Sequence, residues 1–147
     1  MFVSDLLRNR HLVAAGVSWL SAQAVKPMLY WITTRRWDWH WLYRSGGMPS
    51  SHSAAVSSLA TGIAMSEGLD SAAFAIAMVT ALVVLYDAAG VRRAASMQAN
   101  VLNQILTELF RGRPIAQTRL RELIGHTPFE VLVGAALGVG IALVLFR

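Results

Sequence analysis

Four runs of mostly apolar residues constrain the fold of this chain more than any other feature. A helix needs about 20 apolar residues to cross the hydrocarbon core of a bilayer, and these runs approach that length. In lipid, backbone polar groups must be satisfied within the spanning segment, which favours helices. We therefore predict an all-α integral membrane helical bundle of about four transmembrane helices, forming a single domain over residues 1–147. The runs are Leu12–Thr33, Ser50–Ser66, Ser71–Gly90 and Thr127–Phe146.

Composition agrees with a membrane location. Hydrophobic residues make up 55% of the chain and charged residues only 14%, against about 25% charged residues in soluble proteins. The net charge is +5, but a chain this apolar argues against a nucleic-acid partner. Lys26 is the only lysine, and Arg favours planar, bidentate recognition of phosphate or carboxylate. The alternative is that the positive-inside rule placed these Arg residues. The absence of Cys excludes disulfides, thiolate catalysis and Cys-based metal sites.

The first apolar run leaves two alternatives open. Arg8 and Arg10 precede it, and Ala22-Gln23-Ala24 imitates a signal-peptide cleavage site, although the run continues beyond that point as a retained span would. Lys26 inside the run is either functional or reaches back to the membrane interface. Pro27 is expected to break or kink the helix.

The remaining segments carry packing and capping signals. Small residues recur every four positions in the second run, and a Gly-x-x-x-Gly motif lies in the fourth; both permit close helix packing, either within one chain or in a homodimer. Gly68 is a predicted C-cap and Asp70 a predicted N-cap. Val91–Phe110 is predicted to be an amphipathic helix that lies on the membrane or packs on the bundle. The small residues are Ser50, Ala54, Ser58 and Gly62, and the motif is Gly134 and Gly138.

These spans place two polar loops, Thr34–Pro49 and Val91–His126, on one side of the membrane. They hold most of the Arg residues. In the first loop three Trp and a Tyr lie among the Arg residues, which suits a membrane interface. The positive-inside rule puts this face on the cytoplasmic side of the membrane and both termini on the other side. We expect the membrane to be a bacterial inner or plasma membrane.

Polar residues of this face form a set suited to phosphoryl transfer. Fixed cations neutralise phosphate oxygens, one His attacks phosphorus, and a second His protonates the leaving group. A carboxylate fixes the tautomer of the attacking ring, and helix N-termini at Ser50–His52 and Thr127–Glu130 present N–H groups to the anion. The candidates are Lys26, Arg35, Arg36, Ser50, Ser51, His52, Arg119, Arg121, His126 and Glu130.

Each candidate also has an ordinary structural explanation. Ser50 or Ser51 is an expected N-cap, His52 an interfacial His, and Glu130 the last member of a Thr127–Glu130 capping box with Pro at its first helical position. Asp87 ends the third span, where its charge opposes the helix dipole. It either pairs with a cation such as Arg92 or binds a metal cation, and both alternatives stay open.

Two of these segments resemble motifs of the type-2 phosphatidic acid phosphatase superfamily, which includes lipid phosphatases, bacterial acid phosphatases and vanadium haloperoxidases. Pro49-Ser50-Ser51-His52 resembles its Pro-Ser-Gly-His motif, with Ser51 in the place of Gly. His126-x3-Glu130 resembles the end of its Ser-Arg-x5-His-x3-Asp motif, with Glu for Asp.

The basic residues match this superfamily less closely. Lys26 with Arg35 or Arg36 resembles its Lys-x6-Arg-Pro motif, but the spacing is longer and no Pro follows. Arg121 and Arg119 each lie one residue away from the Arg position of the third motif. These departures resemble a divergent branch of small bacterial and plant membrane proteins, over the range 21–143.

The resemblance implies a metal-free lipid phosphatase, without cofactors, that acts on a lipid phosphate or diphosphate within the membrane. In that mechanism His126 forms a phosphohistidine, His52 is the general acid and Glu130 orients His126. The phosphate would be held by Lys26, Arg36, Ser51 and Arg121. Two alternatives remain: a metal-dependent phosphohydrolase or transferase using Asp87, Glu108 or Glu130, and a non-catalytic protein that binds anionic lipids.

Overall fold

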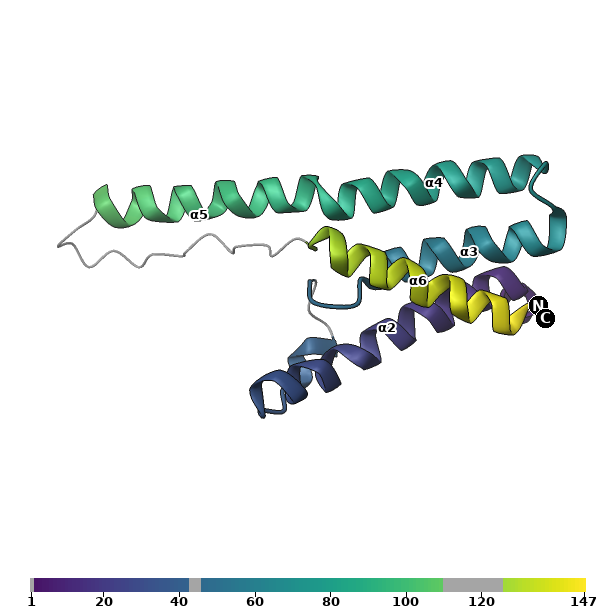
Figure 1. Cartoon of the computed structure of the whole chain (residues 1–147), viewed down its shortest axis with the longest axis horizontal. Coiled ribbons are helices and arrows are strands. Elements are labelled where there is room, and N and C mark those ends of the chain that lie inside the picture. Colours follow the sequence, from purple (N-terminus) through teal and green to yellow (C-terminus); the bar gives the residue numbers. More distant parts are fainter. Residues whose placement is uncertain (1, 43–45, 110–125) are drawn as a thin grey trace.

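The computed structural model describes residues 2–42, 46–109 and 126–147, and these ranges contain helices and turns but no strand. Figure 1 shows several helices side by side in a bundle, with the N- and C-termini at the same end of it. The elements are α1 (Phe2–Arg8), α2 (Arg10–Thr34), the 3₁₀ helix η1 (Trp39–Leu42), α3 (Ser51–Glu67), α4 (Ala72–Ala89), α5 (Val91–Leu109) and α6 (Pro128–Leu145). The predicted all-α class is confirmed in the described ranges.

The central helix is α3, which contacts α2, α4 and α6. Its buried residues are all small: Ser51, Ser53, Ala54, Ser57, Ser58, Ala60 and Gly62. Small side chains let three neighbouring helices approach the α3 backbone closely. Because those helices cover α3, four of its Ser side chains are buried against protein: Ser51, Ser53, Ser57 and Ser58.

The closest approach is between α3 and α6, and it is made by the two glycines of the Gly-x-x-x-Gly motif. A Cβ atom added to Gly134 would clash with the backbone of Ser50, and one added to Gly138 would clash with the backbone of Ala54. The predicted close packing of small residues is therefore present within one chain.

Of the four predicted spans, α4 and α6 are the two described helices that are long and apolar enough to cross a membrane. On α4 the side chains of Ile76, Val79 and Leu82 are exposed. An uncovered apolar face of this kind marks a surface that meets lipid or another protein.

The helix α2 runs without interruption through Pro27, so the predicted break at this residue is wrong. Proline inside a helix costs about 3 kcal/mol relative to Ala, and tertiary packing offsets this cost here. Every fourth residue of α2 is buried, from Ala14 through Ser18 and Ala22 to Lys26, and Pro27 is buried beside this stripe.

The α3–α4 turn confirms one predicted cap and corrects the other. Gly68 is the C-cap of α3, as predicted, with φ of 89°. The N-cap of α4 is Ser71 rather than Asp70, because the Ser71 hydroxyl accepts a hydrogen bond from the backbone N–H of Phe74 at 3.1 Å and donates one to the Gly68 carbonyl at 2.9 Å.

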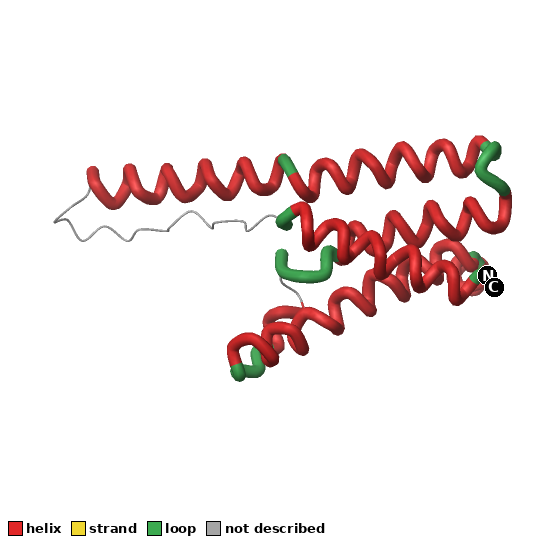
Figure 2. Tube along the Cα trace, in the orientation of Figure 1, coloured by secondary structure: helices red, strands yellow, loops and turns green. Residues whose placement is uncertain are grey.

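The helix α5 continues in the direction of α4 and extends past the other helices (Figure 1). Among the described elements it contacts α4 alone, so the alternative that it packs on the bundle is wrong, and its placement on a membrane surface stays a prediction. Figure 2 shows the Gly46–Ser50 turn and the start of α6 at the same end of the bundle, opposite the termini. This is the convergence of polar segments that the span pattern predicts.

Candidate functional site

The starts of α3 and α6 are held side by side by their backbones. The N–H of Ser50 donates to the carbonyl of Glu130 at 3.1 Å, and the absence of a side chain at Gly134 allows this approach. Two helix N-termini therefore open toward the same region, and their N–H groups and dipoles favour an anion there.

Both helix starts are capped as the sequence predicts. The Ser50 hydroxyl oxygen accepts hydrogen bonds from the Ser53 N–H at 3.4 Å and the Ser53 hydroxyl at 2.8 Å. In the capping box of α6, the Thr127 N–H donates to Oε2 of Glu130 at 2.8 Å, and the Glu130 N–H donates to the Thr127 hydroxyl at 3.3 Å. Ser50 and Glu130 therefore have structural duties in addition to any role in chemistry.

His126 lies directly before this cap and is 2% exposed. Its Nδ1 atom is 3.4 Å from Oε2 of Glu130, the oxygen that also accepts from Thr127, and it has no hydrogen-bond partner of good geometry. Burial lowers the pKa of His126 below its usual range; the charges of Lys26 and His52 add to this, and Glu130 opposes it. The ring is therefore neutral at pH 7, with a lone pair on one nitrogen.

Lys26 reaches this group from α2. It is 3% exposed, so the alternative in which it extends to the membrane interface is wrong. Its ammonium interacts electrostatically with Glu130 and with His126. A buried ammonium needs a compensating anion, and the carboxylate of Glu130 supplies one negative charge.

A cavity of about 220 Å³ opens beside Lys26. Its wall includes Gly47, which has φ of 77° and whose added Cβ would lie 2.8 Å from the Trp41 ring. Glycine is therefore needed here both for backbone conformation and for space. The lining residues are Lys26, Leu29, Tyr30, Thr33, Trp41, Gly47 and Met48.

The outer wall of this cavity was not predicted from the sequence. The Trp41 ring stacks on Tyr30 with centroids 5.0 Å apart, and the side-chain amide of Gln23 donates to the carbonyl of Leu42 at 3.1 Å. Gln23, Lys26 and Tyr30 are spaced by three and four residues, which places them on one face of α2, and this spacing is a signal that could have found the wall. For Trp41 the sequence indicates only a membrane interface.

His52 and Ser51 lie at the start of α3. Ser51 is 2% exposed, whereas His52 is exposed, and its charge acts on His126. The structure thus brings His52, His126, Glu130 and Lys26 into one electrostatically coupled group.

Arg35 and Arg36 do not join this group. Both are exposed, and Arg35 is the C-cap of α2 with its guanidinium carbon 6.0 Å from the Trp31 ring centroid. Nine residues separate Arg35 from Lys26, or about 13 Å along the helix axis. The long spacing between the Lys and the Arg residues explains this separation.

Four candidates cannot be placed. Arg119 and Arg121 lie outside the described residues, as do the side chains of Arg92 and Glu108. Asp87 is exposed near the end of α4, and its pairing with a cation stays a prediction. No group of three or more His, Asp or Glu residues suited to hold a metal occurs within the described ranges.

The fold and the site together define a class: a helical bundle with apolar outer faces, a buried His and a half-buried Glu at two paired helix starts, and a buried Lys on α2 that interacts with both. Residues 7–141 match the Divergent PAP2 family, and the chain belongs to this family, which confirms the predicted relationship to type-2 phosphatidic acid phosphatases. The chain is also 39% identical over 152 residues to the uncharacterized membrane protein YuiD of Bacillus subtilis (strain 168), covering 96% of both proteins. No solved structure matches the chain. The relative and the two apolar helices support a membrane protein.

Proposed function

We propose that this chain is an integral membrane phosphatase that removes phosphate from a lipid phosphate or diphosphate through a phosphohistidine on His126. One observation carries this proposal. A buried His, whose pKa is lowered so that it is neutral, lies 3.4 Å from a carboxylate and interacts electrostatically with a buried ammonium, at the start of α6 beside the start of α3. A neutral imidazole is a nucleophile, and the surrounding positive potential favours a phosphate as its target.

In this proposal each nitrogen of His126 has a role. Nδ1, which faces Glu130 at 3.4 Å, carries the proton, and this N–H stabilises the positive ring that forms, while Nε2 attacks phosphorus. The Nε2–P bond forms as the bond from phosphorus to the leaving oxygen breaks. Lys26 and the helix N-termini neutralise the phosphoryl oxygens.

His52 completes the proton balance. It donates a proton to the leaving alkoxide or phosphate in the first step. In the second step it accepts a proton from the water that attacks the phosphohistidine, and this releases inorganic phosphate and returns both His residues to their starting states.

The membrane arrangement is part of the same proposal. We propose that α2, α3, α4 and α6 all cross the bilayer of a bacterial plasma membrane. The lower hydropathy of α3 suits a helix covered by three neighbours, and the polar face of α2 buries Lys26 toward the site. The Arg-rich loops place the site at the cytoplasmic face, and the lipids around the bundle supply the substrate.

The test is phosphate release from phosphatidic acid and from a prenyl diphosphate by purified protein. His126→Ala should lower the rate by at least roughly 10³-fold, as expected when a nucleophile is removed. His40→Ala is the matched control, since the side chain of this His is 90% exposed and pairs with Asp38. Acid-labile ³²P on wild type, but not on the His126 variant, would identify the intermediate.

Two results would contradict the mechanism. Undiminished activity of His126→Ala would reject the nucleophile. Activity that disappears in a chelator and returns with a divalent metal would replace the metal-free mechanism with the metal-dependent one.

A further inference from the structure

The end of α2 and the loop that follows it present aromatic and basic side chains to the outside. Trp31, Trp37 and Trp39 are all exposed, and so are Arg35 and Arg36 between them. The rings of Trp37 and Trp39 are in edge-to-face contact with centroids 5.1 Å apart, and the Arg35 guanidinium lies over the Trp31 ring. These residues together are called the α2–η1 surface below.

The charge of the α2–η1 surface is positive. Asp38 is the one acidic residue between Trp31 and Leu42, and its carboxylate accepts the backbone N–H of His40 at 2.9 Å and lies 2.8 Å from Nδ1 of the same residue. In the described part of the chain, neither Arg35 nor Arg36 forms an ion pair with a carboxylate. Their guanidinium groups therefore suit an external anion, and the planar donor geometry of Arg matches phosphate.

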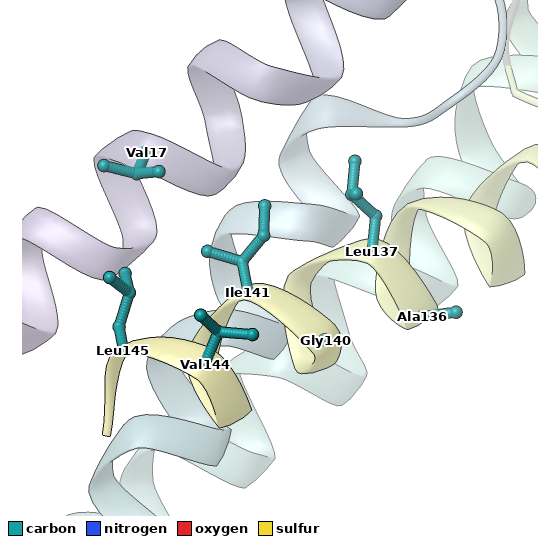
Figure 3. A pocket seen from close by; sticks show the side chains of 7 residues that line it. All are labelled: Val17, Ala136, Leu137, Gly140, Ile141, Val144 and Leu145. Carbon is teal, nitrogen blue, oxygen red and sulfur yellow. The ribbon is translucent and has the colours of Figure 1, made fainter. Parts of the chain in front are cut away.

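The surface of α2 changes along the helix. In its first half, Val17 lines a groove with residues of α6, and every lining residue is apolar (Figure 3). At its end, exposed Trp and Arg side chains take over. A change from apolar residues to Trp and Arg is typical of a helix that passes from the hydrocarbon of a bilayer into its head-group region. The α2–η1 surface thus has the composition expected at the level of the lipid head groups.

The same loop forms the outer wall of the cavity beside the candidate site. In η1, Trp39 is exposed, whereas Trp41 stacks on Tyr30 and lines the cavity. The side-chain amide of Gln23 donates to the carbonyl of Leu42 and ties the end of η1 to α2. Because Trp39 and Trp41 belong to one helix of four residues, a contact that fixes Trp39 from outside also restricts Trp41 in the wall.

The backbone at Arg35 points to a use for its side chain. Arg35 is the C-cap of α2, and its φ of 56° lies in the left-handed region. Glycine is the usual residue in this conformation, because a Cβ atom there has a steric cost. The backbone N–H of Arg35 binds the Trp31 carbonyl, and a glycine could donate the same hydrogen bond. The turn itself therefore does not require an Arg side chain.

We propose that the α2–η1 surface binds anionic phospholipids of the surrounding membrane that are not substrates. The guanidinium groups of Arg35 and Arg36 contact lipid phosphates, and the Trp rings lie among the head groups. The bound lipids hold η1 in place and so fix the outer wall of the cavity. Arg35 and Arg36, which lie apart from the buried His and Lys, thus act outside the chemistry, and this binding does not depend on the proposed phosphatase activity.

The test measures the quenching of Trp fluorescence by brominated lipids. The full chain carries Trp19→Phe, because Trp19 is exposed on α2 outside this surface. It is placed in phosphatidylcholine nanodiscs that contain a minor fraction of brominated phosphatidylglycerol, or of brominated phosphatidylcholine with the same acyl chains. Phosphatidylglycerol is an anionic phosphodiester, so it is not a substrate for release of inorganic phosphate in one step.

Phosphatidylglycerol should quench the Trp residues more strongly than phosphatidylcholine at equal fraction. High salt should reduce the difference, because exposed charges are screened. Equal quenching by the two lipids would overturn the proposal. Quenching by neither lipid would mean that protein covers the surface, and this result would overturn the proposal as well.

Arg35→Gln/Arg36→Gln should lower the preference for phosphatidylglycerol at least about fivefold, the contribution of one Arg close to an anionic surface. Arg8→Gln/Arg147→Gln is the matched control, since it removes the same charge from exposed residues near the two termini. Equal losses in the two double variants would overturn the proposal. Arg35→Gly should also lower the preference, but it should unfold at an equal or higher temperature, because Gly adopts the left-handed conformation without strain.

The link to the cavity wall has a measurement of its own. Hydrogen exchange of the η1 amides should be slower in nanodiscs with phosphatidylglycerol than in pure phosphatidylcholine, and Arg35→Gln/Arg36→Gln should abolish this difference. Preferential quenching without slower exchange would keep the lipid site and overturn its effect on the wall. His126→Ala, which removes the proposed nucleophile, should retain both lipid effects. Loss of the lipid preference in His126→Ala would show that the surface is not separate from the site.

Discussion

The substitution Gly138→Ala tests the packing on which the site depends. An added Cβ would clash with the carbonyl oxygen of Ala54 and lie 2.8 Å from its carbonyl carbon and 2.9 Å from its Cα. These are backbone atoms, which cannot rotate away as a side-chain tip can, so α6 and α3 must separate. Overpacking of this kind costs about 1–3 kcal/mol, and the better helix propensity of Ala returns about 1 kcal/mol. We expect a net loss of stability of up to about 2 kcal/mol.

The rate of lipid phosphate hydrolysis by Gly138→Ala should fall by more than the loss of stability alone would cause. The same helix contact holds Ser50 against Glu130, so separating α3 from α6 moves His52 relative to His126. A displacement of about 1 Å in a catalytic group can lower the rate roughly 10²-fold. The assays are thermal unfolding in detergent and hydrolysis of a lipid phosphate, measured at a temperature where both proteins are folded.

Gly140→Ala is the matched control, because the same chemical change is made two residues away into open space. It should keep the helix propensity gain of about 0.5–1 kcal/mol and unfold at a higher temperature. If Gly138→Ala and Gly140→Ala change stability equally, the α3–α6 contact is not as close as described. If Gly138→Ala instead converts a dimer to a monomer without destabilising the chain, the motif packs between chains.

The remaining predictions concern the charges and the loop of the site. Glu130→Gln removes the carboxylate that raises the pKa of His126, so an NMR titration should show that pKa moving further down; an unchanged pKa would mean that the two groups are not coupled. Lys26→Met removes a charge that lowers the same pKa, so the shift should have the opposite sign, and equal signs for both variants would contradict the assigned group. Gln23→Leu removes the hydrogen bond to the Leu42 carbonyl and should lower the stability of this contact by about 0.5–1.5 kcal/mol. The expected result is faster proteolysis after η1, and unchanged proteolysis would show that this hydrogen bond does not hold the loop.

Local signals in the sequence predicted both helix starts and one helix end. The Thr127–Glu130 capping box, the cap at Ser50 and the C-cap at Gly68 each depend on a few adjacent residues. The interaction that decides them lies within one turn, so a single sequence carries the information. Asp70 and Ser71 show the limit of this rule, because two competent caps stood side by side and only the three-dimensional turn selected between them.

Features that depend on packing between distant helices were not predictable in the same way. Pro27 lowers helix propensity, and only burial of the α2 stripe explains why the helix continues through it. The Gly-x-x-x-Gly motif predicted a close contact, but its partner on α3 could lie in the same chain or in another. The sequence offered both Lys26 and Arg35 as candidate phosphate ligands. The structure shows that they lie far apart along α2.

The position of Glu130 explains why the site is built at a helix start rather than on a loop. Its Oε2 atom accepts the Thr127 N–H at 2.8 Å and lies 3.4 Å from His126, while its backbone carbonyl binds Ser50. One residue thus helps to cap α6, ties α6 to α3 and faces the buried His. Because these contacts form as the helix forms, His126 and the start of α3 are positioned by the same interactions that stabilise the bundle. A carboxylate with both duties needs the reach of Glu, since a capping box requires the longer side chain to return to its own N-cap.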